Sequence, residues 1–228
     1  MNTEQTVTLE NRVRVHAAMA DPTRLRVVDL LATSDASVSE VGARLGVASN
    51  LLAHHLRVLE QAGLVTRHRS EGDARRTYLS LGGPLAPLVR DGAPRGGSVT
   101  PARRVLFVCT ANTARSHLAA ALWRRASTVE AASAGTDPGS RVNPAAISVG
   151  RRHDLEVPDV APRLLADTLA GDDLVITVCD RAHEEIGVAA WAHWSVADPV
   201  AGGRAAFERA YAALESRVHA LAPVVVPA

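Results

Sequence analysis

Hydrophobic and polar residues follow one periodicity in the first third of the chain and another in the rest. In the first third, apolar side chains recur every three or four positions, a spacing that predicts amphipathic helices. The predicted helices cover residues 7–20, 22–31, 38–45 and 49–62. Two short alternating runs at residues 64–69 and 76–81 then predict a β-hairpin with a charged tip. This pattern predicts a mainly α-helical domain that carries a hairpin wing.

Turn residues indicate how these helices connect. Asp21 followed by Pro22 is typical of a helix start, because aspartate caps free N–H groups and proline fits the first turn. Gly46 provides a tight turn between the third and fourth predicted helices. The third and fourth predicted helices with this turn form a helix-turn-helix, and the predicted hairpin after them makes it a winged helix-turn-helix domain.

The fourth predicted helix and the wing carry side chains suited to double-stranded DNA. We expect the solvent-facing side of the helix to enter a major groove and the wing arginines to hold phosphates. The helix residues are Ser49, Asn50, Ala53, His54 and Arg57, and the wing residues are Arg69, Arg75 and Arg76. The alternative is that these side chains form only a solvated surface.

In the second half of the chain, short apolar runs alternate with helical patterns. Strands are predicted over residues 105–108, 130–133 and 174–178, and helices over residues 116–126, 144–153, 162–169 and 204–221. Such alternation predicts an α/β domain with a parallel sheet flanked by helices on both faces. Ligands bind at the carboxyl ends of the strands in such folds, and both cysteines, Cys109 and Cys179, follow a predicted strand.

Composition places a boundary between the halves and limits the partners. A stretch rich in proline and glycine predicts a linker at residues 83–101, between a first domain at residues 1–82 and a second domain at residues 102–228. The formal net charge is +1, so DNA binding must depend on local charge. The chain shows neither a leader segment nor an apolar run long enough for a membrane span, and we expect a cytoplasmic protein.

The segment from Cys109 to Ser116 carries the clearest chemistry. It joins a predicted strand to a predicted helix, and a helix N-terminus with a neighbouring arginine favours a thiolate. The backbone N–H groups of the loop and the guanidinium of Arg115 suit a tetrahedral oxyanion, with Cys109 as nucleophile. The predicted oxyanion-binding residues are Thr110, Ala111, Asn112, Thr113, Ala114 and Arg115.

Ser116 and Asp198 complete the predicted site, and Asn112 has a second predicted role in it. Ser116 can donate its hydroxyl to the Cys109 sulfur, and Asn112 can brace the loop from the side facing away from the anion. A leaving oxygen also needs a proton, and Asp198 lies where a carboxylic acid is required, before the last helix.

Residues 21–81 resemble the ArsR family of bacterial repressors in their Asp-Pro-Thr-Arg start, the glycine turn and the triplet His54-His55-Leu56. The resemblance implies a DNA-binding repressor that forms a homodimer, with the first helix at its interface. Arsenic-sensing members carry two cysteines where this chain has Ser37 and Ser39, so no metal site is expected.

Residues 103–221 resemble the low-molecular-weight phosphotyrosine phosphatase superfamily, in the Cys-x5-Arg-Ser loop, in Ser133-Ala134-Gly135-Thr136 and in the late Asp-Pro. Within it, the segments at residues 175–179, ending at Cys179, and at residues 193–202, starting at His193, resemble the arsenate reductase branch. That resemblance implies attack of Cys109 on arsenic, with Asp198 assisting loss of hydroxide and Cys179 as the second thiol.

Two thiol positions of that branch are changed here, since Ala114 and Ile186 stand where some members have cysteine. We expect no bound cofactor, but an external thiol reductant, either a small thiol or a thioredoxin-like protein. Two alternatives stay open: an aryl-phosphate phosphatase fused to the regulator, and a regulator whose second domain only senses an oxyanion. Val200 and Ala201 disfavour the first, because the phosphatases usually carry aromatic residues after the Asp-Pro.

Overall fold

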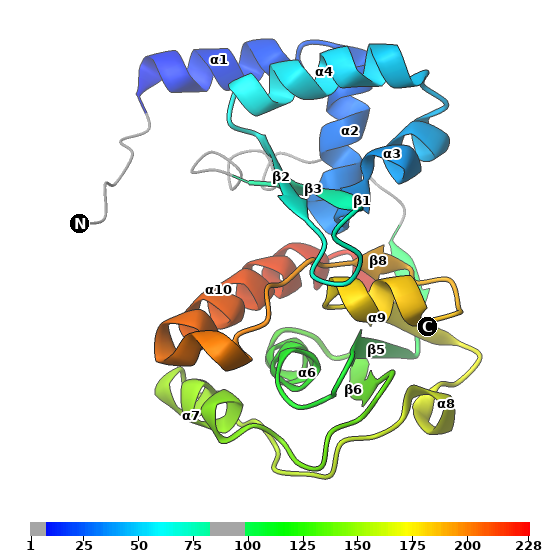
Figure 1. Cartoon of the computed structure of the whole chain (residues 1–228), viewed down its shortest axis with the longest axis vertical. Helices are drawn as coiled ribbons and strands as arrows, with labels where there is room; N and C mark the ends of the chain where they lie inside the picture. Colours follow the sequence, from blue (N-terminus) through cyan, green and yellow to red (C-terminus); the bar gives the residue numbers. More distant parts are fainter. Residues whose placement is uncertain (1–7, 83–98) are drawn as a thin grey trace. The chain divides into compact units, whose positions relative to one another are not determined.

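A computed structural model of the chain describes residues 8–82 and 99–228 and divides it into two compact units (Figure 1). We call them the N-terminal and the C-terminal domain and treat each separately. Residues 83–98 of the predicted linker and the first residue of the first predicted helix lie outside the described part.

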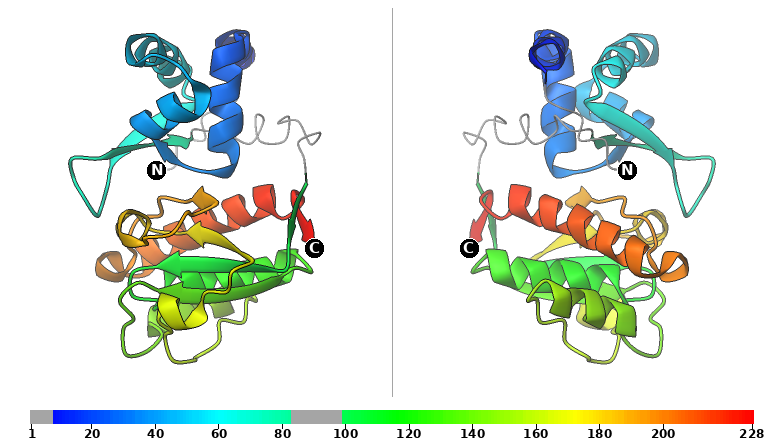
Figure 2. Two further views of the ribbon diagram at one scale, coloured as in Figure 1. Left: turned by 90° about the vertical axis from the view of Figure 1, so that its right-hand side faces the viewer. Right: turned by 90° about the vertical axis from the view of Figure 1, so that its left-hand side faces the viewer.

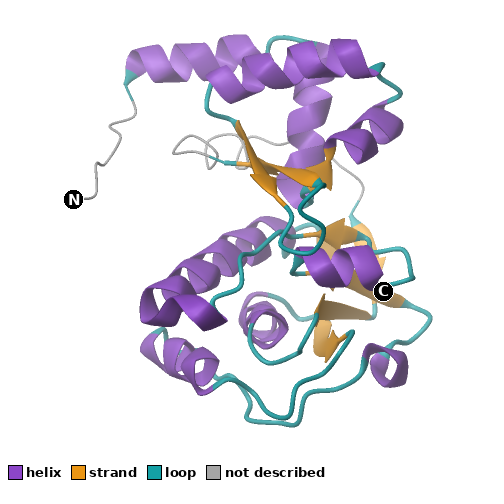
Figure 3. Ribbon diagram, viewed as in Figure 1, coloured by secondary structure: helices purple, strands orange, loops and turns teal. Residues whose placement is uncertain are grey.

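The N-terminal domain consists of four helices and a small antiparallel sheet. The helices are α1 (Leu9–Met19), α2 (Pro22–Thr33), α3 (Val38–Leu45) and α4 (Ser49–Gln61), and the strands are β1 (Ala36–Ser37), β2 (Val65–Arg69) and β3 (Thr77–Leu81), in the order β1-β3-β2. The core contains the fully buried Leu31, Leu56 and Leu79, which come from two helices and the wing. The predicted winged helix-turn-helix is confirmed (Figure 3).

The helix ends follow from local chemistry. The side chain of Asp21 accepts a hydrogen bond from Arg24 N at 2.9 Å, which caps α2. Ser37 and Glu40 form a capping box at the start of α3. Gly46 ends α3 at φ 65°, a backbone angle that glycine adopts without strain.

The C-terminal domain is built on four parallel strands in the order β6-β5-β7-β8. They are β5 (Arg104–Cys109), β6 (Glu130–Gly135), β7 (Asp173–Thr177) and β8 (Ala192–His193). The helices are α6 (Arg115–Ala126), α7 (Pro144–Arg152), α8 (Leu165–Thr168), α9 (Asp180–Glu185) and α10 (Gly203–Leu221), with a 3₁₀ turn η1 at Val200–Gly202. Figures 1 and 2 show helices α6, α7 and α10 on one side of the sheet and α8 and α9 on the other, as predicted.

Several boundaries differ from the prediction because pairing and packing determine short elements. The predicted loop from Ala134 begins two residues later, since β6 pairs with β5 as far as Cys109 opposite Gly135. The helix predicted over residues 162–169 shortens to α8. Strand β4 (Thr100–Ala102) pairs in parallel with β9 (Val225–Pro227), so the last two residues of the predicted linker belong to a sheet.

Among the described residues, no helix combines the length and the apolar character that a membrane crossing requires.

Candidate active site and nucleic-acid interface

The candidate active site is the loop between Cys109, the last residue of β5, and Arg115, the first residue of α6. The backbone N–H of Asn112 donates to the Cys109 sulfur at 3.2 Å, and the Ser116 hydroxyl lies 3.1 Å from the same sulfur. Both contacts place hydrogen-bond donors where a thiolate would accumulate charge. The structure thus brings together the predicted nucleophile and Ser116.

The carbonyl groups of the loop are turned outward and held by the segment after β6. The oxygens of Thr110, Ala111 and Thr113 accept hydrogen bonds from the N–H groups of Asp137, Gly139 and Asn143 at 2.9, 2.8 and 2.8 Å. In a trans peptide the carbonyl and the following N–H point in opposite directions. The N–H groups of Ala111, Asn112 and Ala114 therefore point toward the inside of the loop, where an oxyanion would lie.

Asn112 links the loop to its surroundings. It is fully buried and adopts φ 49°, the left-handed region that asparagine tolerates better than most residues. Its amide nitrogen donates to Ser116 Oγ at 2.8 Å, and its amide oxygen accepts from Arg163 N at 2.8 Å. These two hydrogen bonds tie the Asn112 side chain to Ser116 and to the backbone of Arg163, and so brace the loop.

Arg115 connects the loop to the predicted acid. Its Nη1 donates to the Val196 carbonyl at 2.8 Å, and its Nη2 lies 3.5 Å from Asp198 Oδ2. Burial alone would lower the pKa of the Arg115 guanidinium, but the neighbouring groups Cys179, Cys109 and Asp198 raise it. Arg115 therefore stays charged, which its predicted role in binding an oxyanion requires.

Cys179 lies at the edge of the same loop, as the N-cap of α9. Its sulfur is 3.5 Å from the Thr110 hydroxyl, and the residue as a whole is only 2% exposed. Burial raises the pKa of the Cys179 thiol, Arg115 opposes this rise, and Cys109 adds to it. Both cysteines are free thiols, so a second reducing group is available beside the candidate nucleophile.

The second candidate site is on the N-terminal domain. All five predicted helix residues are exposed along α4, namely Ser49, Asn50, Ala53, His54 and Arg57, and so are the wing residues Arg69, Arg75 and Arg76. The two histidines of the triplet separate, because His55 is buried with its Nδ1 3.5 Å from Asp21 Oδ1. His54 alone faces the solvent.

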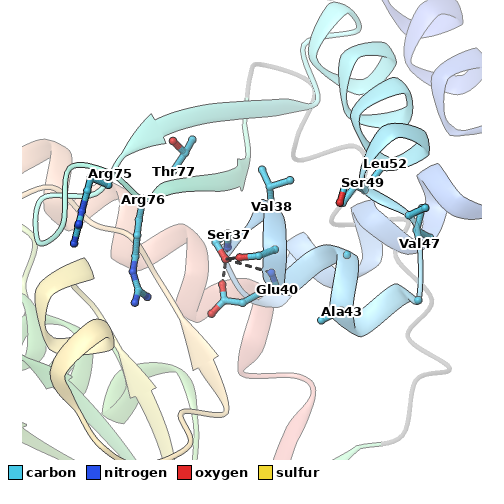
Figure 4. A pocket seen from close by; sticks show the side chains of 14 residues that line it. Ser37, Val38, Glu40, Ala43, Val47, Ser49, Leu52, Arg75, Arg76 and Thr77 are labelled. Atoms are coloured by element: carbon cyan, nitrogen blue, oxygen red, sulfur yellow. Dashed lines mark hydrogen bonds between the residues drawn. The ribbon is translucent and has the colours of Figure 1, made fainter.

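A groove of about 1120 Å³ lies between α3, the turn into α4 and the start of β3 (Figure 4). Ser37 and Ser39 are in its wall, with their hydroxyl oxygens 3.0 Å apart, and Arg75 and Arg76 line its other end. A concave surface with arginines beside a recognition helix fits the course of a DNA backbone.

A cysteine at the end of a parallel strand, an arginine that opens the next helix and inward N–H groups between them define an oxyanion-binding cysteine enzyme. Residues 104–226 match the family described as low molecular weight phosphotyrosine protein phosphatase, and the chain belongs to this family. Residues 19–68 match a helix-turn-helix domain. The predicted order, a helix-turn-helix domain followed by a domain of the phosphatase and arsenate reductase superfamily, is confirmed.

Individual proteins resemble each half. The low molecular weight protein-tyrosine-phosphatase Wzb of Salmonella typhimurium is 34% identical over 129 residues, covering 49% of this chain and 87% of Wzb. The transcriptional repressor SdpR of Bacillus subtilis is 33% identical over 55 residues, covering 24% of this chain and 61% of SdpR. The solved structure of an Archaeoglobus fulgidus arsenate reductase is 28% identical with a TM-score of 0.45, covering 52% of this chain and 98% of that one.

Sequence patterns did not reveal the supports of the loop. The hydrogen bonds from Asp137, Gly139 and Asn143 come from a segment with no apolar periodicity, and Arg163 contributes only its backbone. One signal was present at Gly135, where a side chain would meet Thr110 O at 2.5 Å. A glycine at a strand end beside a candidate anion loop indicates such a close backbone approach.

Proposed function

We propose that this protein is a DNA-binding transcriptional regulator joined to an enzyme that reduces arsenate with its own thiols. The observation that carries the enzymatic part is the second buried thiol, Cys179, beside the oxyanion loop. Hydrolysis of a phosphate ester needs one cysteine, whereas reduction of arsenic needs two electrons, which two thiols supply together.

The first step is attack of the Cys109 thiolate on arsenic. The sulfur–arsenic bond forms and an arsenic–oxygen bond breaks, while Asp198 donates a proton so that water leaves. The loop N–H groups and Arg115 hold the remaining oxygens, whose charge increases in the transition state. The half-exposed position of Asp198, 3.5 Å from Arg115, supports this role.

The second step is attack of the Cys179 sulfur on the Cys109 sulfur. A disulfide forms, the sulfur–arsenic bond breaks, and its electron pair stays on arsenic, which leaves as arsenite. Each sulfur gives up one electron and Cys179 loses its proton. An external thiol, either a small thiol or a thioredoxin-like protein, then reduces the disulfide, and no bound cofactor is required. Two reduced cysteines fit the cytoplasm, where thiols are kept reduced.

Hydrolysis of aryl phosphates is the second candidate, and the family match and the likeness to Wzb favour it. In that reaction Cys109 attacks phosphorus, Asp198 protonates the leaving phenolate and water cleaves the cysteinyl phosphate. Cys179 has no role in it, so the cysteine variants separate the two candidates.

For the N-terminal domain we propose binding of double-stranded DNA as a homodimer. The exposed face of α4 supplies side chains for base edges, and the wing arginines supply phosphate contacts. Two copies related by a two-fold axis would match two half-sites in the DNA. The likeness of this domain to SdpR, a transcriptional repressor, supports the proposal.

The test compares arsenate and p-nitrophenyl phosphate as substrates of one preparation. Pre-reduced protein without added thiol should release one arsenite per chain and lose two hydrogens in mass as the disulfide forms. Cys109→Ser should abolish both activities, whereas Cys179→Ser should abolish arsenite release and leave hydrolysis intact. Rapid hydrolysis without any arsenite release, with or without added thiols, would establish the phosphatase instead.

A further inference from the structure

A second cluster of buried polar side chains lies behind Cys179, outside the oxyanion loop. One carboxylate oxygen, Asp180 Oδ1, lies 3.1 Å from His193 Nε2 and also accepts a hydrogen bond from Ser195 Oγ. We call Asp180, His193 and Ser195 the acid-loop clamp, because His193 and Ser195 belong to the segment that leads to Asp198. Both ends of the clamp are close in sequence to candidate catalytic residues. Asp180 directly follows Cys179, and Ser195 lies three positions before Asp198.

The clamp fixes the position of the chain at residues 193–195, just before Asp198. His193 is the last residue of β8 and is 1% exposed. Trp194, between the two clamped residues, is equally buried and lies against Phe107 with ring centroids 5.6 Å apart. The first residues after β8 are therefore tied to the core before the chain turns outward to Asp198.

The Thr177 hydroxyl links the clamp to a second histidine. An ionised Asp180 only accepts, so His193 donates to it from Nε2. The Thr177 oxygen lies 3.0 Å from His193 Nδ1 and 3.0 Å from His183 Nδ1, and the two imidazoles stack with ring centroids 4.1 Å apart. Burial would raise the pKa of Asp180, but the hydrogen bonds from His193 and Ser195 lower it.

Beyond the clamp, few contacts hold the Asp198 side chain. Val196 O accepts from Arg115, Asp198 Oδ1 accepts from Val200 N at 3.1 Å, and its Oδ2 is 3.5 Å from Arg115. The Asp198 side chain is 51% exposed, so packing does not fix it. Its distance to a bound anion depends instead on the backbone path between Ser195 and Asp198.

We propose that Asp180 is a positioning residue that acts through Ser195 and His193 to place Asp198 for proton donation. The inference rests on the proposed enzymatic function, in either of its two forms, because both require Asp198 as the acid. It assigns to the residue after the second thiol a role in the first chemical step.

The test uses the full chain and two aryl phosphates whose leaving groups differ in basicity. Phenyl phosphate needs a proton donor for its basic phenolate, whereas p-nitrophenyl phosphate needs it much less. Ser195→Ala should lower kcat for phenyl phosphate by about 10-fold and for p-nitrophenyl phosphate by less than about 3-fold, a partial loss of general-acid catalysis. Asp180→Asn should act in the same direction, and Ser195→Thr, which retains the hydroxyl, should restore the wild-type ratio.

Two comparisons make the result specific. Asp198→Asn gives the full effect of losing the acid, and Ser148→Ala removes a hydroxyl that accepts from Arg152 at 2.9 Å on α7, away from the acid loop. Equal losses on both substrates in Ser195→Ala, or a weaker affinity for inorganic phosphate, would show a general structural role and overturn the proposal.

Hydrogen exchange gives a measurement that needs no turnover. Amides in a peptide covering residues 194–200 should exchange about 10-fold faster in Ser195→Ala and Asp180→Asn, while the peptide covering residues 104–116 stays unchanged. If wild-type protein turns over neither substrate nor arsenate, the proposed function fails, and this exchange pattern still decides whether the clamp holds the loop. Unchanged exchange at residues 194–200 in both variants would refute the proposal that the clamp positions the segment leading to Asp198.

Discussion

Substitution of Gly135 by alanine tests whether the oxyanion loop is held from behind. Gly135 ends β6 opposite Cys109, and its N–H donates to Arg163 O at 2.9 Å. A Cβ on Gly135 would lie 2.5 Å from Thr110 O, closer than real Cβ atoms come to other atoms, and 3.0 Å from Asn112 N, which is a tight contact. Since these neighbours are backbone atoms, the loop itself must move to accommodate the methyl group.

The size of the effect follows from the overlap. Forcing one methyl group into a packed site costs about 1 to 3 kcal/mol of folding free energy. A shift of about 1 Å in a reacting group costs on the order of 100-fold in rate. We therefore expect Gly135→Ala to lower the melting temperature by about 3 to 10 °C and to weaken binding of inorganic phosphate by about 10-fold.

Melting followed by circular dichroism and phosphate titration by calorimetry measure the two quantities. Gly150→Ala is the matched control, because its Cβ would meet Leu155 O at 2.7 Å in a region remote from the loop. Gly171→Ala, which meets nothing within 4 Å, should change neither quantity. If Gly135→Ala binds phosphate as tightly as wild type, or if Gly150→Ala weakens binding equally, the loop is not supported at Gly135.

Two further predictions concern other parts of the chain. Arg57→Ala should weaken binding to an operator duplex by about 10-fold, measured by fluorescence anisotropy at several salt concentrations, whereas Arg141→Ala in the C-terminal domain should not. Equal affinities of Arg57→Ala and the wild type would exclude the exposed face of α4 as the DNA-binding surface. Burial lowers the pKa of His117 below its ordinary value of 6.5, so the folded state binds fewer protons than the unfolded chain. As the pH is lowered below 6.5, the free energy of unfolding measured in urea should decrease by up to about 1.4 kcal/mol per pH unit, and His117→Asn should reduce this slope. Identical slopes in the wild type and the variant would show that His117 is not the cause.

Elements with local signals were predictable from the sequence. Asp21 with Pro22 and Gly46 set their helix ends through hydrogen bonds within a few residues, and the structure reproduces both. The loop from Cys109 to Arg115 was equally clear, since its chemistry depends on residues adjacent in the chain.

Elements that depend on distant partners were not predictable. Strand β8 has two residues, and it is a strand because Thr177 pairs with His193. The clamp around Asp180 joins residues from two segments, each of which alone is typical of an ordinary loop. Only the fold brings Asp180 within hydrogen-bond distance of His193 and Ser195.

The pairing of β4 with β9 has a consequence for how such a protein can arise. Thr100 lies opposite Val225, so the chain enters the C-terminal domain beside the last described strand of that domain. Neither strand belongs to the sheet that carries Cys109. A different domain can therefore be attached ahead of β4 without disturbing the sheet that carries Cys109. Recombination between genes at this junction would join the enzyme domain to a different DNA-binding domain.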